Sequence, residues 1–118
     1  MTNKIIGKAG ETIAKEFLIK KGYEIIEMNY RYSRLAEIDI IAQKANILHF
    51  IEVKTRTQGI YGSAAEAVDY RKQQKIIKTS MFYLGEKFNL TPVRYDVIEV
   101  YIDNDDYRIN HIENAFGG

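Results

Sequence analysis

The spacing of apolar and polar residues along the chain predicts two helices and at least four strands. Residues 5–21 and 64–87 carry apolar side chains three and four positions apart, which is typical of helices with one buried face. Gly22 marks the end of the first helix, because glycine readily adopts the backbone conformation that follows a helix. Segments rich in strand-forming residues are expected to be strands, and they lie at 23–32, 36–43, 47–54 and 93–102.

The order of these elements indicates an α/β protein. Residues 107–116 are expected to be either a short fifth strand or a tail that packs on the core. The order is therefore αβββαβ(β), with a mixed central β-sheet flanked by helices. The glycine-containing segment 55–63 is expected to be a loop. A chain of 118 residues without repeats or a linker is expected to form one domain, residues 1–118.

Only a short segment separates the second and third strands, which predicts a hairpin that turns at Ala45 and Asn46. In that register Ile41 lies opposite Phe50, and Asp39 lies directly opposite Glu52. Side chains alternate along a strand, so Asp39 shares a face with Glu37 and Ile41. The other face of this strand is expected to carry the apolar residues Ile38, Ile40 and Ala42.

Two carboxylates on facing strands repel each other unless a shared proton, a nearby cation or a divalent metal compensates. Oxygen ligands without histidine or cysteine suit Mg²⁺ or Mn²⁺. Lys54 lies two residues beyond Glu52 on the same face, where it could bind a phosphate oxygen or orient a water molecule. These residues predict a site for phosphodiester hydrolysis. The alternative is that Glu52 and Lys54 form a local ion pair on an exposed face.

Each predicted helix offers one further polar residue to this site. Glu11 lies three and seven residues before Ala14 and Leu18, at the margin of the apolar stripe, so its carboxylate could reach the sheet. It could equally be an acid that suits the early turns of a helix. Lys72 lies in line with Val68 and Ile76, and either points at the same site or extends into solvent.

The charge is unevenly distributed along the chain. Residues 1–78 contain 14 Lys or Arg against 9 Asp or Glu, whereas residues 79–118 contain 3 against 7. This distribution is compatible with a basic surface for a polyanion and also with a mixed, solvated surface. Four tyrosines lie near arginines in the sequence, namely Tyr30, Tyr32, Tyr61 and Tyr70. They could stack on unpaired bases or cover strand edges.

Several function classes have no support in the sequence. There is no cysteine, which excludes a disulfide framework, a thiolate zinc site and a cysteine nucleophile. His49 and His111 are far apart, and His49 alternates onto the face opposite Glu52, so they do not predict a zinc site. There is no P-loop and no GxSxG motif. No apolar run approaches 18 residues and no signal peptide is evident, so we expect a cytoplasmic protein without a membrane span.

Six segments together carry a resemblance to a known family, and they are GKAGE at 7–11, AEIDII at 36–41, FIEVKTR at 50–56, KQQK at 72–75, RYDVI at 94–98 and HIENAF at 111–116. In this order they resemble the small bacterial YraN-like family (UPF0102) over essentially the whole chain. That family is similar to the PD-(D/E)xK nucleases, especially the archaeal Holliday-junction resolvases. The family pattern generally has glycine before EID, where this chain has Ala36; this residue fits an extended strand, but would weaken DNA binding if the glycine lets the backbone approach DNA closely.

The resemblance implies a restriction-endonuclease-like core and a metal-dependent endonuclease that acts on DNA, including branched or junction DNA. It assigns catalysis to Glu11, Asp39, Glu52 and Lys54, of which the three acids would bind Mg²⁺ or Mn²⁺. The residues expected to contact DNA are Arg34, Arg56, Arg71, Lys72 and Lys75. Symmetric cutting of two strands would favour a two-fold homodimer. The alternative is a nucleic-acid-binding or scaffold module that keeps the nuclease fold and does not cleave.

Overall fold

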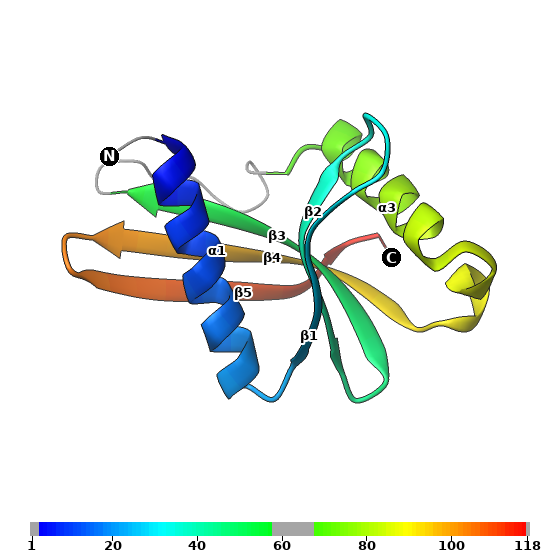
Figure 1. The fold of residues 1–118 in the computed structure, drawn as a ribbon, viewed down its shortest axis with the longest axis horizontal. Helices are drawn as coiled ribbons and strands as arrows, with labels where there is room; N and C mark the ends of the chain where they lie inside the picture. Colours follow the sequence, from blue (N-terminus) through cyan, green and yellow to red (C-terminus); the bar gives the residue numbers. More distant parts are fainter. Residues whose placement is uncertain (1–2, 58–67, 118) are drawn as a thin grey trace.

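The protein, described here from a computed structural model covering residues 3–57 and 68–117, is built on one five-stranded sheet (Figure 1). The strand order is β1-β2-β3-β4-β5, in which β3 and β4 run parallel and all other neighbours are antiparallel. The elements are α1 (Asn3–Lys20), β1 (Glu24–Arg31), β2 (Glu37–Lys44), β3 (Ile47–Thr57), α3 (Tyr70–Leu84), the 3₁₀ helix η1 (Gly85–Leu90), β4 (Val93–Asp103) and β5 (Asp106–Phe116). The predicted α/β class and the order αβββαβ(β) are confirmed, and the uncertain last element is a full strand.

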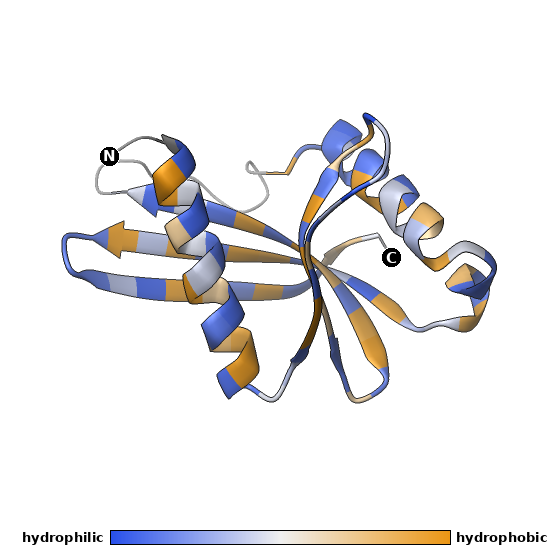
Figure 2. Ribbon diagram, viewed as in Figure 1, coloured by the Kyte–Doolittle hydropathy of each residue, from blue (hydrophilic) through white to orange (hydrophobic). Residues whose placement is uncertain are grey.

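The helices cover opposite faces of the sheet because alternate strand residues enter two separate cores. Ala14 and Leu18 of α1 pack on one face, against a cluster that includes Ile51 and Ile98. Ile76 of α3 packs on the other face, against a cluster that includes Phe50. Residues 48–53 of β3 and 95–100 of β4 are consequently all buried, and hydrophobic residues lie along these strands in Figure 2. Neither helix in the described part of the chain combines the length and apolar character that a membrane crossing requires.

Helix α1 ends where the sequence predicts. Gly22 has a φ of 93°, and its N–H donates to the carbonyl of Ile19 at 3.0 Å. The N–H of Tyr23 donates to the carbonyl of Leu18 at 2.9 Å. This pair of hydrogen bonds is the Schellman arrangement, which satisfies the last carbonyls of a helix and requires a left-handed residue at the position of Gly22.

The β2–β3 hairpin has the predicted register. Ala45 and Asn46 both have positive φ, 52° and 65°, which suits a two-residue hairpin turn. Ile41 pairs with Phe50, and the ladder extends as far as Ile40 and Ile51. It ends one residue before the predicted direct pair of Asp39 and Glu52, and in Figure 1 the two strands separate beyond the crossing at the centre of the sheet.

The start of α3 differs from the prediction. A helix from residue 64 was expected, but Val68 and Asp69 are not helical and α3 begins at Tyr70. Asp69 is the N-cap residue, and its carboxylate accepts a hydrogen bond from the N–H of Lys72 at 2.9 Å. An aspartate satisfies free N–H groups best at this position, so it stops the helix from extending backwards. Residues 58–67, which include most of the predicted loop, the predicted helix start and Tyr61, lie outside the described residues.

The β1–β2 ribbon changes face close to its middle. Ile40 packs in the core under α1, whereas Ile38, predicted to share its face, packs in the core under α3. Opposite this point in β1, Asn29 has a φ of 54°, which interrupts regular strand geometry. Asparagine tolerates this left-handed conformation better than most residues. The twist therefore places Asp39 between the two cores instead of beneath one helix.

Candidate functional site

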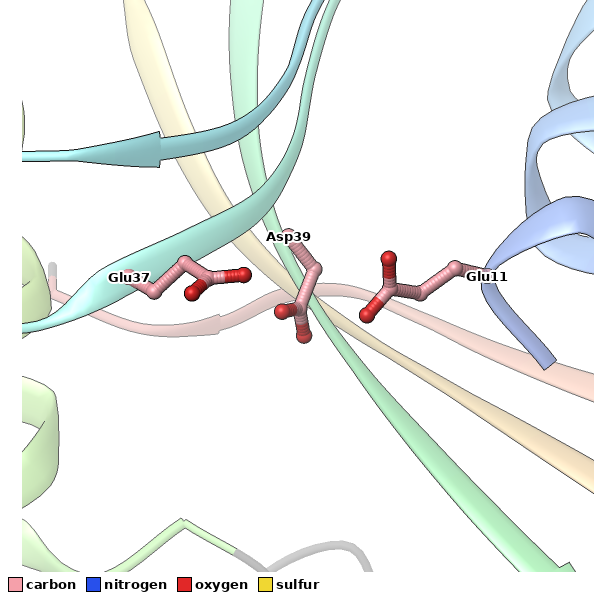
Figure 3. Close-up of side chains that lie close together, drawn as sticks. All are labelled: Glu11, Glu37 and Asp39. Carbon is pink, nitrogen blue, oxygen red and sulfur yellow. The ribbon is translucent and has the colours of Figure 1, made fainter. Parts of the chain in front are cut away.

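Three carboxylates from two elements converge at the centre of the molecule. Glu37 and Asp39 come from β2 and Glu11 comes from α1, and one oxygen of each lies within 4.8 Å of the others. Figure 3 shows Glu11 and Glu37 pointing toward Asp39 from opposite sides. The resemblance predicted Glu11 and Asp39 in a common site, and the structure brings them together. Glu37 was not among the predicted site residues, although its position two residues before Asp39 on the same strand was a usable signal.

Helix α1 lies close enough to the sheet for Glu11 to reach it. A side chain at Gly10 would overlap Thr55 of β3, so this glycine permits the close approach of helix and strand. Glu11, the next residue, is half-buried. The position of its carboxylate therefore depends on a small residue at the contact between α1 and β3.

Asn29 holds two of the carboxylates. Its side-chain Nδ2 donates hydrogen bonds to Glu11 Oε1 and to Glu37 Oε1, both at 2.8 Å. The other oxygen of Glu37 accepts from Arg31 Nη2 at 2.9 Å. The amide thus orients both acids without adding charge, in the way that outer residues orient metal ligands in proteins. Sequence reasoning missed Asn29, and the signal was an asparagine within a segment of strand-forming residues.

Asp39 is the most perturbed of the acids. Burial raises its pKa to about 8, the nearby Glu52 adds to the rise, and a hydrogen bond from the backbone N–H of Val53 to Oδ2 at 2.7 Å acts against it. This hydrogen bond forms just where the β2–β3 ladder has ended. Buried carboxyl groups with such shifts are concentrated at functional sites in enzymes.

Glu52 is paired with two lysines instead of joining the three acids. Its side chain is only 6% exposed, and Oε1 lies 2.7 Å from Lys72 Nζ and 3.5 Å from Lys54 Nζ. Burial lowers the pKa of Lys54. Burial also acts to lower the pKa of Lys72, but the ion pair and hydrogen bond with Glu52 leave it raised. Nearby cations therefore compensate the negative charge of Glu52, which is one of the three possibilities that the sequence left open.

Two hollows meet at Asp39 and Glu52. The first, of about 290 Å³, lies toward α1 and includes Glu11 in its lining. The second, of about 490 Å³, lies toward α3 and includes Glu37 and Lys72. A ligand could therefore reach Asp39 and Glu52 from the side of either helix.

The donor set suits a hard divalent cation. Glu11, Glu37 and Asp39 supply oxygen ligands within the separation that one ion can bridge, and carboxylate oxygens are preferred by Mg²⁺ and Mn²⁺. Among the described residues Asp39 has no hydrogen bond to a cationic side chain, although Lys72 acts to lower its pKa; a bound cation would offset both the cost of burial and the repulsion from Glu52 and Glu11. Glu52, predicted as a ligand, lines both hollows but is already paired with Lys54 and Lys72.

Comparison with known proteins identifies the family. A model of the "Uncharacterised protein family UPF0102" matches residues 10–100. The chain belongs to the UPF0102 family. A UPF0102 protein of Clostridium botulinum strain 657 is 50% identical over 97% of this chain and 95% of its own. A relative from Alkaliphilus oremlandii is 49% identical over 97% of this chain and 99% of its own length. One from Caldanaerobacter subterraneus is 43% identical over 98% of both chains.

In this UPF0102 protein the predicted DNA-contact residues fall into two groups. Arg71, Lys72 and Lys75 line the hollow toward α3, and Arg34 is exposed in the β1–β2 turn next to Leu35, which also lines it. Arg56 lies apart from them, in a separate hollow that includes Arg108 and Tyr101. Arg56 continues the face of Glu52 and Lys54 along β3, but it is not beside the carboxylates.

Ala36 and the tyrosines have the following positions in the UPF0102 fold. Ala36 does not have a positive φ and packs against the core under α3, so the backbone accommodates its methyl group. Tyr30 packs edge-on against Tyr83, at 4.9 Å between ring centroids, and so contributes to the core. Tyr32 stacks on Phe82 at 4.0 Å, and Tyr70 is 74% exposed. Of these three tyrosines, only Tyr70 is largely free to meet a ligand.

The two histidines meet at a buried aspartate that sequence reasoning missed. His49 Nδ1 and His111 Nε2 lie 2.7 Å and 2.9 Å from the same oxygen of Asp96, and the N–H of Asn114 donates to its other oxygen at 2.9 Å. Burial alone would raise the pKa of Asp96, but these hydrogen bonds outweigh it and hold the value at about 2. The network connects β3, β4 and β5. It lies on elements that the pairing of distant strands brings together, which no spacing in the sequence indicates.

Proposed function

We propose that this UPF0102 protein is a metal-dependent endonuclease that hydrolyses DNA phosphodiester bonds. The observation that supports the proposal is the convergence of Glu11, Glu37 and Asp39 within 4.8 Å beside a buried Glu52 paired with Lys54 and Lys72. Three acids that bind a hard cation, next to lysines that bind phosphate, are the components that phosphodiester hydrolysis needs.

The residues of the chain have separate roles in this proposal. Glu11, Glu37 and Asp39 hold Mg²⁺ or Mn²⁺, which when bound would polarise a phosphoryl oxygen. Lys54, whose pKa is lowered by burial, steadies the nucleophile or the negative charge that develops on the phosphate. Glu52 anchors Lys54 and Lys72 at the edge of the carboxylates. Arg71 and Lys75 bind the DNA backbone in the adjoining hollow.

The proposal is tested by incubating labelled junction, flap, duplex and single-stranded DNA with the protein and Mg²⁺ or Mn²⁺. We expect metal-dependent cleavage that Asp39→Asn and Lys54→Ala each reduce at least about 100-fold. Asp105→Asn, which changes an exposed aspartate in the β4–β5 turn, is the matched control and should cleave normally. Full turnover by Lys54→Ala would show that the lysine has no role in the reaction.

Calorimetry with Mn²⁺ separates the two possible ligand sets. The structure favours Glu37 as the third ligand, whereas the resemblance favours Glu52. We expect Glu37→Gln to weaken binding at least tenfold and Glu52→Gln to weaken it less, because Glu52 is buried beside two lysines whereas the arginine paired with Glu37 is exposed. Glu27→Gln, at an exposed position in β1, should have no effect. The opposite ranking of Glu37 and Glu52 would restore the predicted set of Glu11, Asp39 and Glu52.

One observation favours a second function, a nucleic-acid-binding module that does not cleave. Lys72 and Lys54 already compensate the charge of Glu52 without a metal. On this alternative the protein binds DNA but shows no saturable heat with Mn²⁺, and none of the four DNA substrates is cut. A saturable heat of Mn²⁺ binding that is lost in Asp39→Asn would exclude this second function.

A further inference from the structure

A third hollow lies beside the hollow toward α3, on the side away from the carboxylates. It has a volume of about 530 Å³ and lies between α3 and the β1–β2 turn. It shares Leu35, Arg71 and Lys75 with the hollow that contains Asp39 and Glu52. A chain that passes over the carboxylates toward α3 therefore enters this hollow next, which we call the α3 hollow; its lining consists of Leu35, Tyr70, Arg71, Gln74, Lys75, Ile77, Lys78 and Met81.

The α3 hollow combines cations with apolar surface. Arg71, Lys75 and Lys78 lie four and three residues apart, on one side of α3, and the first turns of this helix are hydrophilic in Figure 2. None of the described residues that line the hollow is acidic. Met81 is 45% exposed and Tyr70 is 74% exposed, so apolar and aromatic surface is open to a ligand. The ligand that fits is negatively charged and also has a flat, apolar part.

An unpaired nucleotide offers both its phosphate and the face of its base to a protein, whereas a paired nucleotide offers the phosphate but not the base face. Within a continuous duplex each base face is covered by its neighbours, so only phosphates would reach the cations and the apolar surface would stay unfilled. Bases that have left the stack can lie against Tyr70 at the start of α3 and against Met81 about 16 Å further along the helix, while the phosphates between them meet the cations. We propose that the α3 hollow binds unpaired nucleotides of a single-stranded DNA segment.

This inference gives the substrate class of the endonuclease and, for cleavage, rests on the proposed function. The α3 hollow adjoins the hollow that contains the carboxylates, so the unpaired nucleotides belong to the same DNA segment as the phosphate that would be cut. The substrates are then DNA molecules with a single-stranded segment, such as flaps, gaps or single strands, and a blunt continuous duplex is a poor substrate.

Binding without metal tests the inference separately from cleavage. Fluorescence anisotropy in EDTA compares labelled oligothymidine with a strand of abasic deoxyribose phosphates of the same length and charge. We expect wild type to bind oligothymidine roughly 5- to 100-fold more tightly than the abasic strand, the range that stacking of one base supplies. It should also prefer oligothymidine to a blunt duplex.

Variants of exposed residues locate the effect. Met81→Ala and Tyr70→Ala should each reduce the preference for oligothymidine over the abasic strand at least threefold and leave binding of the abasic strand within twofold. Lys75→Gln should weaken both strands by a similar factor, because it contacts phosphate only. Leu90→Ala is the matched control, since Leu90 is 83% exposed in η1 outside the hollow, and it should change neither strand.

Equal wild-type affinity for oligothymidine and the abasic strand would overturn the inference. So would a preference that Met81→Ala and Tyr70→Ala both leave unchanged. Neither result would affect the proposed cleavage, which is tested separately by comparing wild type with Asp39→Asn in the presence of Mg²⁺ or Mn²⁺. Conversely, a base preference lost in Met81→Ala and Tyr70→Ala would support the α3 hollow even if wild type cut none of the four DNA substrates.

Discussion

Lys72 Nζ of α3 lies 2.7 Å from Oε1 of Glu52 in β3, so an ion pair connects the second helix to the centre of the sheet. The Glu52 side chain is buried and the Lys72 side chain is 39% exposed. Such a pair contributes less to stability than a fully buried one, but among the described residues removing Lys72 leaves Lys54, at 3.5 Å, as the one cation paired with Glu52.

We expect Lys72→Gln to lower the free energy of unfolding by about 1–2 kcal/mol, as measured by urea denaturation at neutral pH. Lys78→Gln, at an exposed position of the same helix, should change it by less than about 0.5 kcal/mol. The double variant Glu52→Gln, Lys72→Gln should recover part of the loss, since no charge is then left unpaired. Equal stability of Lys72→Gln and wild type would mean that Lys54 alone compensates Glu52.

Asn29 should act on metal binding through the acids that it orients. Asn29→Gly keeps the left-handed backbone but removes both hydrogen bonds to Glu11 and Glu37. We expect Mn²⁺ affinity in calorimetry to fall about 10- to 100-fold, the usual effect of removing a residue that orients ligands. Asn114→Gly is a suitable control, because Asn114 also has a positive φ, 52°, and lies in β5, where its N–H donates to Asp96. Unchanged affinity in Asn29→Gly would show that the acids hold their positions without it.

Gly10 should be intolerant of a side chain, whereas Gly7 in the same helix should accept one. Gly10→Ala forces α1 away from Thr55, and we expect a loss of about 1–3 kcal/mol in the free energy of unfolding together with weaker Mn²⁺ binding through Glu11. A Cβ on Gly7 meets no atom within 4 Å, so Gly7→Ala should stabilise the helix by about 0.5–1 kcal/mol. Thermal denaturation of both variants measures the contrast, and similar effects of the two changes would contradict it.

Asp96 should make stability depend on acidic pH. Its pKa is held at about 2 in the folded protein against 3.8 for an ordinary aspartate, so its contribution is complete above pH 4 and is lost as the pH falls toward 2. The shift corresponds to about 2 kcal/mol. In urea denaturation between pH 2 and 5, Asp96→Asn should show a shallower fall in stability than wild type. Asp105→Asn should follow wild type, and an unchanged slope in Asp96→Asn would contradict the assignment.

Local patterns predicted much of the fold. Gly22 ends α1 because a helix end requires a left-handed residue, and the short Ala45–Asn46 turn sets the β2–β3 register as far as Ile40 and Ile51. Both features depend on residues close in sequence, so spacing alone was sufficient. The helix expected from residue 64 was wrong at Val68 and Asp69, because the apolar spacing outweighed the capping signal of Asp69.

The sequence by itself determined the elements, their order, and the presence of acids and lysines on β2, β3 and the two helices. Only the tertiary structure decided which of these side chains meet. The β1–β2 ribbon turns at Asn29, which brings Glu37 close to Asp39. The close contact of α1 at Gly10 brings Glu11 to the same place, whereas Glu52 pairs with Lys72. The twist of a sheet and the packing of helices on it depend on many residues that are distant in the sequence, so the spacing within one segment does not specify them.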